Sequence, residues 1–280
     1  MSETQKTGLI GFYDTHPINE DEILAKAAAH GASLDALTQL DLKDFDQDHY
    51  GGIEVLDALA DAAGIGSEHH VLDVCSGMGG PARWLAYQHD CRVTGLDFTV
   101  SRVEAARRLT QRVQLDHLID FVHGDAAAMT LPSSRYDVLI AQESWLHIPD
   151  KAALISECVR VLKPGGRIAF TDIVVRSELD RPTEERLAAE MHTANIASAD
   201  NYVALLEKHG CVIAGQVDLS GDWKNILVER LEMYRSLRDT TVAKFGESRY
   251  KEYDDAYSHF VGCFVANKLG GVRIVARKAA

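Results

Sequence analysis

The chain has 280 residues, of which 46% are hydrophobic and 25% charged, and its formal net charge is −13. This length and composition are typical of one large globular domain, or of a core domain with a smaller appendage. The negative charge argues against binding to nucleic acids or anionic membranes, because phosphate surfaces would be repelled at long range. A small substrate that is neutral, zwitterionic or cationic fits the charge better.

The start of the sequence has no basic segment followed by an apolar one, and no apolar run approaches the roughly 18 residues that span a membrane. We therefore expect a cytoplasmic protein. The five cysteines are widely spaced and odd in number, so neither a Cys-x-x-Cys metal site nor a disulfide framework is expected. Only Cys75 lies where a thiol could contact a ligand.

The N-terminal region, residues 1–65, shows no strand pattern. Residues 19–30 begin with capping residues and continue as an alanine-rich amphipathic helix, and a second helix is predicted over 52–64. We expect residues 1–65 to form a helical lid, which would exclude water from a reacting centre.

From residue 70 to residue 175, short apolar runs alternate with helical patterns. Runs without a polar alternation are typical of parallel strands that are buried on both faces. The predicted strands cover 70–74, 91–96, 118–122, 136–141 and 166–174, and the predicted helices cover 80–89, 99–113 and 150–162. The alternation predicts a doubly wound α/β sheet.

The remaining chain completes a core domain over residues 66–280. It is predicted to hold a helix over 200–209, a strand over 211–217, a long helical stretch over 222–262 and a last strand over 270–277. Helical insertions at about 176–198 and 219–265 would sit above the carboxyl edge of the sheet, where they can cover a substrate.

The turn after the first predicted strand has the sequence CSGMGG, residues 75–80. Glycines such as Gly77 and Gly79 let a ligand approach the backbone, and the helix N-terminus beyond them offers unpaired N–H groups. Asp97 ends the next strand, where a carboxylate accepts hydrogen bonds from a ribose diol. The alternative is that Asp97 caps the following helix. Together these residues predict a cofactor that contains a nucleoside.

Asp73 helps to distinguish between the possible nucleoside-containing cofactors. With Ala82 at the third glycine position, the turn still satisfies the dinucleotide fingerprint, so an oxidoreductase is a competing hypothesis. A carboxylate inside the strand before the turn would repel a pyrophosphate and attract an ammonium. Asp73 therefore favours a cofactor that carries an amino-acid group.

The pattern D-x-x-x-G-x-G-G, from Asp73 to Gly80, resembles the first motif of class I S-adenosylmethionine-dependent methyltransferases. The sequence V-L-K-P-G-G at 161–166 is a frequent signature of the same family. The motifs follow in the expected order over about residues 45–175, and they are most similar to the small-molecule type, the sarcosine/dimethylglycine N-methyltransferase-like group. This resemblance implies S-adenosyl-L-methionine as cofactor and a Rossmann-like seven-stranded, mostly parallel sheet whose last strand inserts antiparallel.

The resemblance also implies roles for residues after the third and fourth strands. Asp125 would accept from the adenine amino group, and Ala126 would offer its backbone N–H to the ring. A loop-capping role is the alternative for Asp125. At the end of the fourth strand, the backbone at Gln142 would hold the methionine ammonium.

Two side chains beyond Gln142 are candidates for the reacting end of the site. Trp145 could form an aromatic wall for the sulfonium or for a substrate cation, and His147 could take a proton from a substrate. The alternatives are a packed core aromatic for Trp145 and a helix-capping histidine for His147.

The segment 45–52 concentrates polar and aromatic groups, FDQDHYGG. It resembles the segment before the core in the glycine, sarcosine and dimethylglycine N-methyltransferases, which implies that it approaches cofactor and substrate. On this basis Gln47 and His49 are substrate-binding candidates and Tyr50 is a catalytic candidate. Tyr13 could likewise reach the methyl donor and is a further substrate-binding candidate. The alternative for the segment is a glycine-terminated turn with a packed tyrosine.

The leading hypothesis is therefore methyl transfer from S-adenosylmethionine to a nitrogen of a small metabolite by in-line displacement. An O- or C-methyltransferase with His147 as base is one alternative, and a non-catalytic protein that binds the cofactor is another. We expect a small-molecule substrate, no nucleic acid and no membrane. A homodimer is compatible with the sequence.

Overall fold

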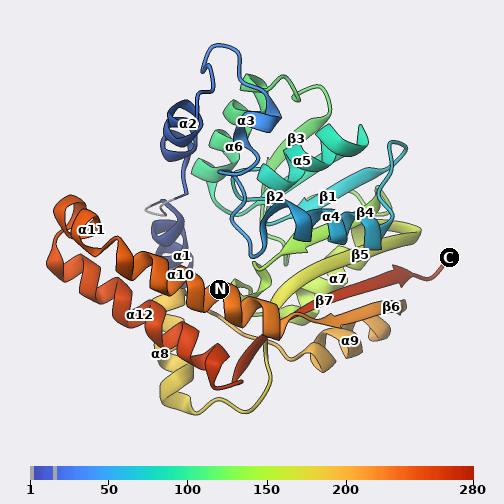
Figure 1. Cartoon of the computed structure of the whole chain (residues 1–280). Helices are drawn as coiled ribbons and strands as arrows, with labels where there is room; N and C mark the ends of the chain where they lie inside the picture. The colour runs from blue at the N-terminus through green and yellow to red at the C-terminus, as the bar shows by residue number, and fades with distance from the viewer. Residues whose placement is uncertain (1–2, 15–17) are drawn as a thin grey trace.

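The computed structural model describes residues 3–14 and 18–280 (Figure 1). Its centre is one seven-stranded sheet with the strand order β3-β2-β1-β4-β5-β7-β6. Strands β1 to β5 pair in parallel, and β7 runs antiparallel between β5 and β6. The predicted fold, a doubly wound and mostly parallel seven-stranded sheet, is confirmed.

The strands follow the predicted apolar runs to within one or two residues at most ends. β1, for example, buries Val71 in the cluster on one face of the sheet and Leu72 in the cluster on the other, which explains why these two neighbouring residues are both apolar. The strands are β1 His70–Val74, β2 Arg92–Asp97, β3 Ile119–His123, β4 Tyr136–Gln142, β5 Leu162–Val175, β6 Cys211–Asp218 and β7 Leu269–Lys278.

Helices cover both faces of the sheet. The helices α4 (Gly52–Ala63), α5 (Gly80–His89) and α6 (Val100–Arg112) supply apolar side chains to one core cluster. The helices α7 (Lys151–Val161) and α9 (Ala199–Lys208) supply them to the cluster on the other face. The change of face falls between β1 and β4, so a crevice opens at the carboxyl ends of these two strands.

Strand β5 begins earlier than predicted. Its pairing with β4 passes from Tyr136↔Leu162 directly to Val138↔Arg167, so the residues between Leu162 and Arg167 bulge out of the ladder. Gly165 has a φ of 75° in this bulge, a left-handed conformation that favours glycine.

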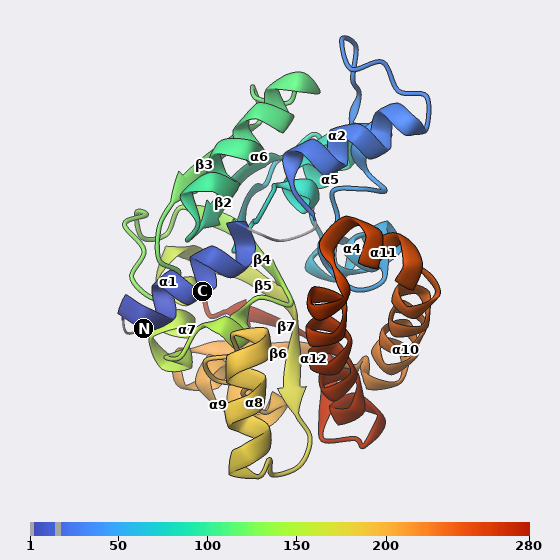
Figure 2. The same ribbon diagram turned by 90° about the vertical axis from the view of Figure 1, so that its left-hand side faces the viewer.

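The long helical stretch after β6 is three helices: α10 (Ser220–Ser236), α11 (Arg238–Phe245) and α12 (Glu247–Val265). Figures 1 and 2 show α10 and α12 side by side, with α8 (Arg181–Met191) next to α12. Trp223 of α10 anchors this unit, because its ring lies against Gly271 of β7 where a Cβ would collide with it. These helices therefore dock on the antiparallel end of the sheet.

The N-terminal region contains three helices before α4: α1 (Glu3–Asp14), α2 (Glu20–Ala29) and α3 (Gln39–Leu42). The prediction found α2, whose N-cap Asn19 accepts a hydrogen bond from the backbone of Glu22, but missed α1. Two glycines, Gly8 and Gly11, lower the helix propensity of α1. Within the described part of the chain, no helix is long and apolar enough to cross a membrane.

Candidate active site

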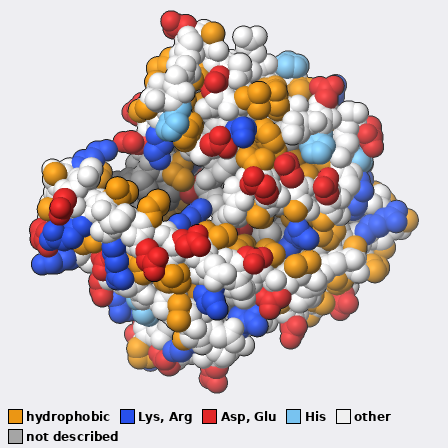
Figure 3. Space-filling model, in the orientation of Figure 1, with side chains coloured by type: hydrophobic (Ala, Val, Ile, Leu, Met, Phe, Trp, Pro, Cys, Tyr) orange, Lys and Arg blue, Asp and Glu red, His pale blue; other side chains and the backbone are white. Residues whose placement is uncertain are grey.

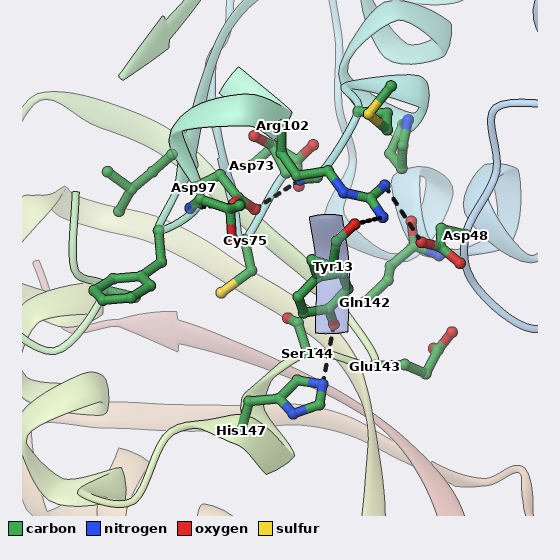
Figure 4. A pocket seen from close by; sticks show the side chains of 18 of the residues that line it. Tyr13, Asp48, Asp73, Cys75, Asp97, Arg102, Gln142, Glu143, Ser144 and His147 are labelled. Atoms are coloured by element: carbon green, nitrogen blue, oxygen red, sulfur yellow. Dashed lines mark hydrogen bonds and ion pairs between the residues drawn. The ribbon is translucent and has the colours of Figure 1, made fainter. Parts of the chain in front are cut away.

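A cavity lies at the carboxyl ends of β1, β2 and β4, where the strand order reverses (Figure 4). The turns after these strands form its floor, the segment 46–49 and α6 form one wall, and α1 closes it. The lining includes Leu9, Tyr13, Asp46, Asp48, His49, Asp73, Cys75, Ser76, Gly77, Pro81, Asp97, Arg102, Asp125, Ala126, Gln142, Glu143, Ser144 and His147.

The glycine turn after β1 brings backbone to the cavity. Cys75, Gly77 and Gly79 have φ values of 65°, 53° and 75°, in the left-handed region, which is costly for the non-glycine Cys75. A Cβ on Gly77 would have no neighbour within 4 Å, whereas a Cβ on Gly80 would collide with the Asp46 carbonyl. The turn thus keeps one side open for a ligand and packs its other side on the segment before α4.

Asp97 lies at the tip of β2 and bridges the turns on either side of it. Its Oδ2 accepts from the Gly77 N–H at 2.8 Å and its Oδ1 accepts from the Thr99 N–H at 2.9 Å. Burial raises the pKa of Asp97, and these two hydrogen bonds oppose that rise. Each carboxylate oxygen keeps a further lone pair, so Asp97 can hold the turn and accept from a ligand.

Asp73 of β1 is 3% exposed and faces the same cavity. Its Oδ2 has no hydrogen-bond partner in the described chain. Burial, together with the charge of Asp97, raises the pKa of Asp73 to about 7. A cationic ligand group would stabilise the ionised form of both carboxylates.

Other polar atoms around Asp73 also lack partners among the described residues. They are Oγ of Ser76, both amide atoms of Gln142 and Oγ of Ser144. Buried polar atoms are rarely left unpaired, so a group with several donors and acceptors fits between them. The amino-acid and ribose parts of S-adenosylmethionine are such groups, and the residues present therefore fit this cofactor.

Asp125 and Ala126 follow β3 and line the cavity. The Oδ1 of Asp125 accepts from the Ala127 N–H at 2.9 Å, which is the loop-capping contact named as the alternative. A carboxylate can accept several hydrogen bonds, so this capping contact leaves acceptor lone pairs on Asp125 for an exocyclic amine.

His147 belongs to a short 3₁₀ helix, η1 (Trp145–His147), and its Nε2 lies 3.0 Å from the Tyr13 hydroxyl. Its Nδ1 lies 3.0 Å from the His192 carbonyl oxygen, which can only accept, so Nδ1 carries the proton and Nε2 accepts from Tyr13. Burial lowers the pKa of His147 to about 4, which keeps the ring neutral.

Arg102 of α6 holds the end of α1 against the cavity. Its Nη2 donates to the Tyr13 carbonyl at 3.0 Å, and its guanidinium lies 5.2 Å from the centre of the Tyr13 ring. Figure 4 shows Tyr13 between Arg102 and His147. Arg102 lies in a helical pattern that is typical of a solvated helix face, so this contact could not be predicted from the sequence.

Glu143 follows β4 directly and was not among the predicted site residues. It has a φ of 42°, and its carboxylate accepts from the Tyr50 N–H at 2.8 Å and from the Thr171 hydroxyl at 2.6 Å. Burial raises the pKa of Glu143 to about 8. In the sequence, the only indication of a functional role for Glu143 is an acidic residue at the carboxyl end of a predicted central strand. Its strained backbone is visible only in the structure.

Trp145 is not in the cavity, which corrects its predicted role as an aromatic wall. The side chain is 1% exposed and packs in the core. The centre of its ring lies 4.2 Å from the centre of the Phe170 ring and 5.8 Å from that of the Tyr202 ring. The turn of η1 explains this, because it directs Trp145 into the sheet and His147 toward the cavity.

The segment 45–52 is only partly brought to the cavity. His49 lines it, while Gln47 bridges the Asp46 carboxylate at 2.7 Å and His49 Nε2 at 2.9 Å. The Tyr50 ring packs on Trp223 outside the cavity lining, with 5.1 Å between the ring centres. Tyr50 contacts the site through its backbone N–H, which donates to Glu143.

Residues 72–170 match the family model described as a methyltransferase domain. The chain is 33% identical to methyltransferase GfsG of Streptomyces halstedii over 172 residues, 60% of this chain and 62% of that protein. It is 30% identical to a sarcosine/dimethylglycine N-methyltransferase of Halorhodospira halochloris over 148 residues, 52% of each. The chain therefore spans between half and two thirds of these two relatives.

Among solved structures, phosphoethanolamine N-methyltransferase 2 of Haemonchus contortus in complex with S-adenosyl-L-methionine superimposes with a TM-score of 0.76. The match has 20% identity and covers 96% of this chain and 60% of that one, and it shows a shared fold. Together with the family match, these comparisons confirm the predicted resemblance to S-adenosylmethionine-dependent methyltransferases of small molecules.

Proposed function

We propose that this methyltransferase domain transfers a methyl group to a nitrogen of a small molecule. S-Adenosylmethionine supplies an activated methyl group on its sulfonium, so the protein's task is to align the acceptor in a site that excludes water. The observation that carries the choice of nitrogen is the buried carboxylate of Glu143, which borders the cavity that fits the cofactor.

The cofactor would be held by the cavity's polar side chains, several of which have atoms without a hydrogen-bond partner, and by the backbone beside the open space at Gly77. Asp97 would accept from the ribose hydroxyls, and Asp73 with the Gln142 backbone would receive the methionine ammonium. Asp125 and the Ala126 N–H would contact the adenine ring. Gly77 and Gly79 would supply the open backbone beside these contacts, as their φ values and the free space at Gly77 support.

Glu143 would receive the acceptor. An amine arrives largely as an ammonium ion and must lose a proton before its lone pair can attack. The Glu143 carboxylate has unused lone pairs, and its pKa of about 8 suits a group that takes up a proton near neutral pH. A hydroxyl acceptor brings no positive charge that would stabilise the ionised form of Glu143, which is why nitrogen is preferred to oxygen.

Tyr13 and His147 would act together as the closure of the site. The Tyr13 hydroxyl donates to His147 Nε2, and this contact joins α1 to the segment after β4 over the cavity. Residues 1–65 would serve as the lid that α1 belongs to, and the insertions at 176–198 and 219–265 would cover the acceptor.

Arg230 of α10 would bind an anionic group of the acceptor. Of the six other arginines of residues 176–262, Arg249 is exposed, and five form ion pairs with carboxylates: Arg176, Arg181, Arg186, Arg235 and Arg238. Arg230 forms none with a described residue. Its guanidinium lies 5.0 Å from the centre of the Tyr50 ring and donates to the His49 carbonyl at 3.2 Å.

A panel of amines, alcohols, phenols and carbon acids, incubated with labelled S-adenosylmethionine, tests this function. We expect methylated products from amines, and better turnover from amines that carry a carboxylate or phosphate than from matched amines without one. Turnover of hydroxyl or carbon acceptors alone would contradict the nitrogen assignment, and cofactor binding without any turnover would favour a non-catalytic protein. A cytoplasmic location and a homodimeric state stay predictions.

A further inference from the structure

A second hollow lies at the opposite edge of the sheet, where β1, β4 and β5 begin and β7 ends. Its volume is about 440 Å³. In Figure 3, Lys and Arg side chains gather on the right-hand side, where Figure 1 places the start of β5 and the end of β7. The hollow is lined by His69, Asp137, Lys163, Pro164, Gly165, Gly166, Arg167 and Arg277.

Two arginines on neighbouring strands line this hollow. Arg167 and Arg277 are register partners on the antiparallel strands β5 and β7, so their side chains project from the same face of the sheet. Neither forms an ion pair with a described residue, and Arg277 makes only a hydrogen bond from Nε to the Gly165 carbonyl, at 3.2 Å. Like charges placed directly opposite each other destabilise a strand pair unless an anion lies between them.

The third cation in the hollow is already neutralised. Lys163 Nζ lies 2.8 Å from both carboxylate oxygens of Asp137, the one acidic residue in the lining. Neither guanidinium group therefore has an ion-pair partner among the described residues, in a chain whose net charge is −13; that of Arg277 is exposed and that of Arg167 is half-buried.

His69 adds a third donor that points to the same place. Its Nδ1 accepts from the Gly66 N–H at 2.9 Å, so the neutral ring carries its proton on Nε2. That Nε2 lies 3.1 Å from Nη2 of Arg167, which is also a donor, and 3.5 Å from the largely exposed Glu68 carboxylate. Two N–H donors side by side require a shared acceptor, which Glu68 at this distance does not fully provide.

We propose that this hollow binds a phosphate group, either free or as a phosphate monoester, with Arg167, Arg277 and His69 as its donors. A phosphate carries a charge between about −1.5 and −2 and three strong acceptor oxygens, which matches two guanidinium ions and one imidazole N–H. A Cβ on Gly165 would lie 3.5 Å from Nη2 of Arg277, so glycine at this position leaves space beside that arginine. This site is separate from the methyl-transfer cavity at the other edge of the sheet.

Titration calorimetry on the full chain tests the site, with inorganic phosphate, glycerol 3-phosphate and citrate as separate probes in chloride buffer of matched ionic strength. The variants are Arg277→Gln and Arg167→Gln, and the matched control is Arg112→Gln, an exposed arginine at the end of α6. Circular dichroism establishes that each variant is folded before titration.

We expect saturable binding of phosphate or glycerol 3-phosphate to the wild-type protein and to Arg112→Gln. Binding should weaken by about tenfold or more in Arg277→Gln and Arg167→Gln, because each loses a charge-assisted contact. Tighter binding of glycerol 3-phosphate than of inorganic phosphate would identify a monoester as the ligand, and the reverse order would identify free phosphate. Equal affinity in all variants, no saturable binding, or binding of citrate alone would overturn the proposal.

Discussion

The Tyr13 hydroxyl donates to Nε2 of His147 at 3.0 Å, across 134 residues of sequence. This contact joins the last turn of α1 to the 3₁₀ helix that follows β4, and so fastens the N-terminal helix over the cavity. Arg102 secures the same turn from the other side through the Tyr13 carbonyl. Closure of the site therefore depends on α1, the helix that the sequence patterns did not predict.

Tyr13→Phe should lower turnover by about ten- to a hundredfold, because it removes one positioned polar group at the reacting end. The ring and its contact with Arg102 are retained, so the variant should fold normally. Steady-state kinetics of S-adenosylhomocysteine release measure the effect. Tyr87→Phe, at an exposed tyrosine, is the control; equal kinetics of the two variants would contradict a role for the hydroxyl.

Glu143 should make the reaction pH-dependent. With its pKa raised to about 8, the carboxylate is protonated below that pH and cannot receive an ammonium, so kcat/KM should rise as pH increases through about 8. Glu143→Gln should abolish this rise, whereas Glu178→Gln, at an exposed site, should preserve it. An unchanged profile in Glu143→Gln would remove Glu143 from the mechanism.

The same carboxylate should also affect stability. The pKa of Glu143 is higher in the folded protein than its usual value of 4.5, so its contribution to stability is complete below about pH 4.5 and is lost as pH rises through about 8. Urea unfolding of the wild-type chain and of Glu143→Gln over this range measures the loss. A parallel pH dependence of the two proteins would contradict the raised pKa.

Asp97→Asn should weaken binding of S-adenosylmethionine by about 1–3 kcal/mol, the effect of impairing hydrogen bonds that the ribose hydroxyls donate to a charged acceptor. Calorimetric titration with the cofactor measures the change directly. Asp61→Asn, on the exposed face of α4, is the matched control and should bind with unchanged affinity. Wild-type affinity in Asp97→Asn would refute the ribose assignment.

The wall of the cavity rests on a buried ion pair between Arg83 and Asp46, at 2.9 Å, with both side chains 0% exposed. Asp46→Ala leaves the Arg83 charge buried and should cost about 3–5 kcal/mol in the free energy of unfolding. Asp44→Ala, at an exposed carboxylate, should cost much less. If both variants unfold at the same urea concentration, the pair does not stabilise this wall.

Much of the sheet could be predicted because its strands are buried on both faces. Val71, Leu72 and Val74 are apolar for that reason, and the glycine turn marks where their strand ends. The boundary of β5 could not be predicted, since the register shift between Tyr136 and Val138 depends on its partner strand.

Site residues could be predicted where the strand that carries them determines their position. Asp73 and Asp97 are examples, because they lie at the carboxyl ends of adjacent strands. Trp145 was not, because an aromatic residue after a strand suits a core as well as a cavity. Arg102 escaped prediction because its partner Tyr13 lies in a distant helix, and a charged residue on a helix resembles solvated surface until that helix is placed.

The most direct test is carbon NMR of the product formed from S-adenosylmethionine with a ¹³C-labelled methyl group. N-, O- and C-bound methyl carbons resonate in different regions, so one spectrum identifies the atom that receives the methyl group. With an amine that carries an anionic group, we predict an N-methyl signal from the wild-type chain and a much weaker one from Glu143→Gln. An O- or C-methyl signal, or equal N-methyl signals from both proteins, would contradict the account.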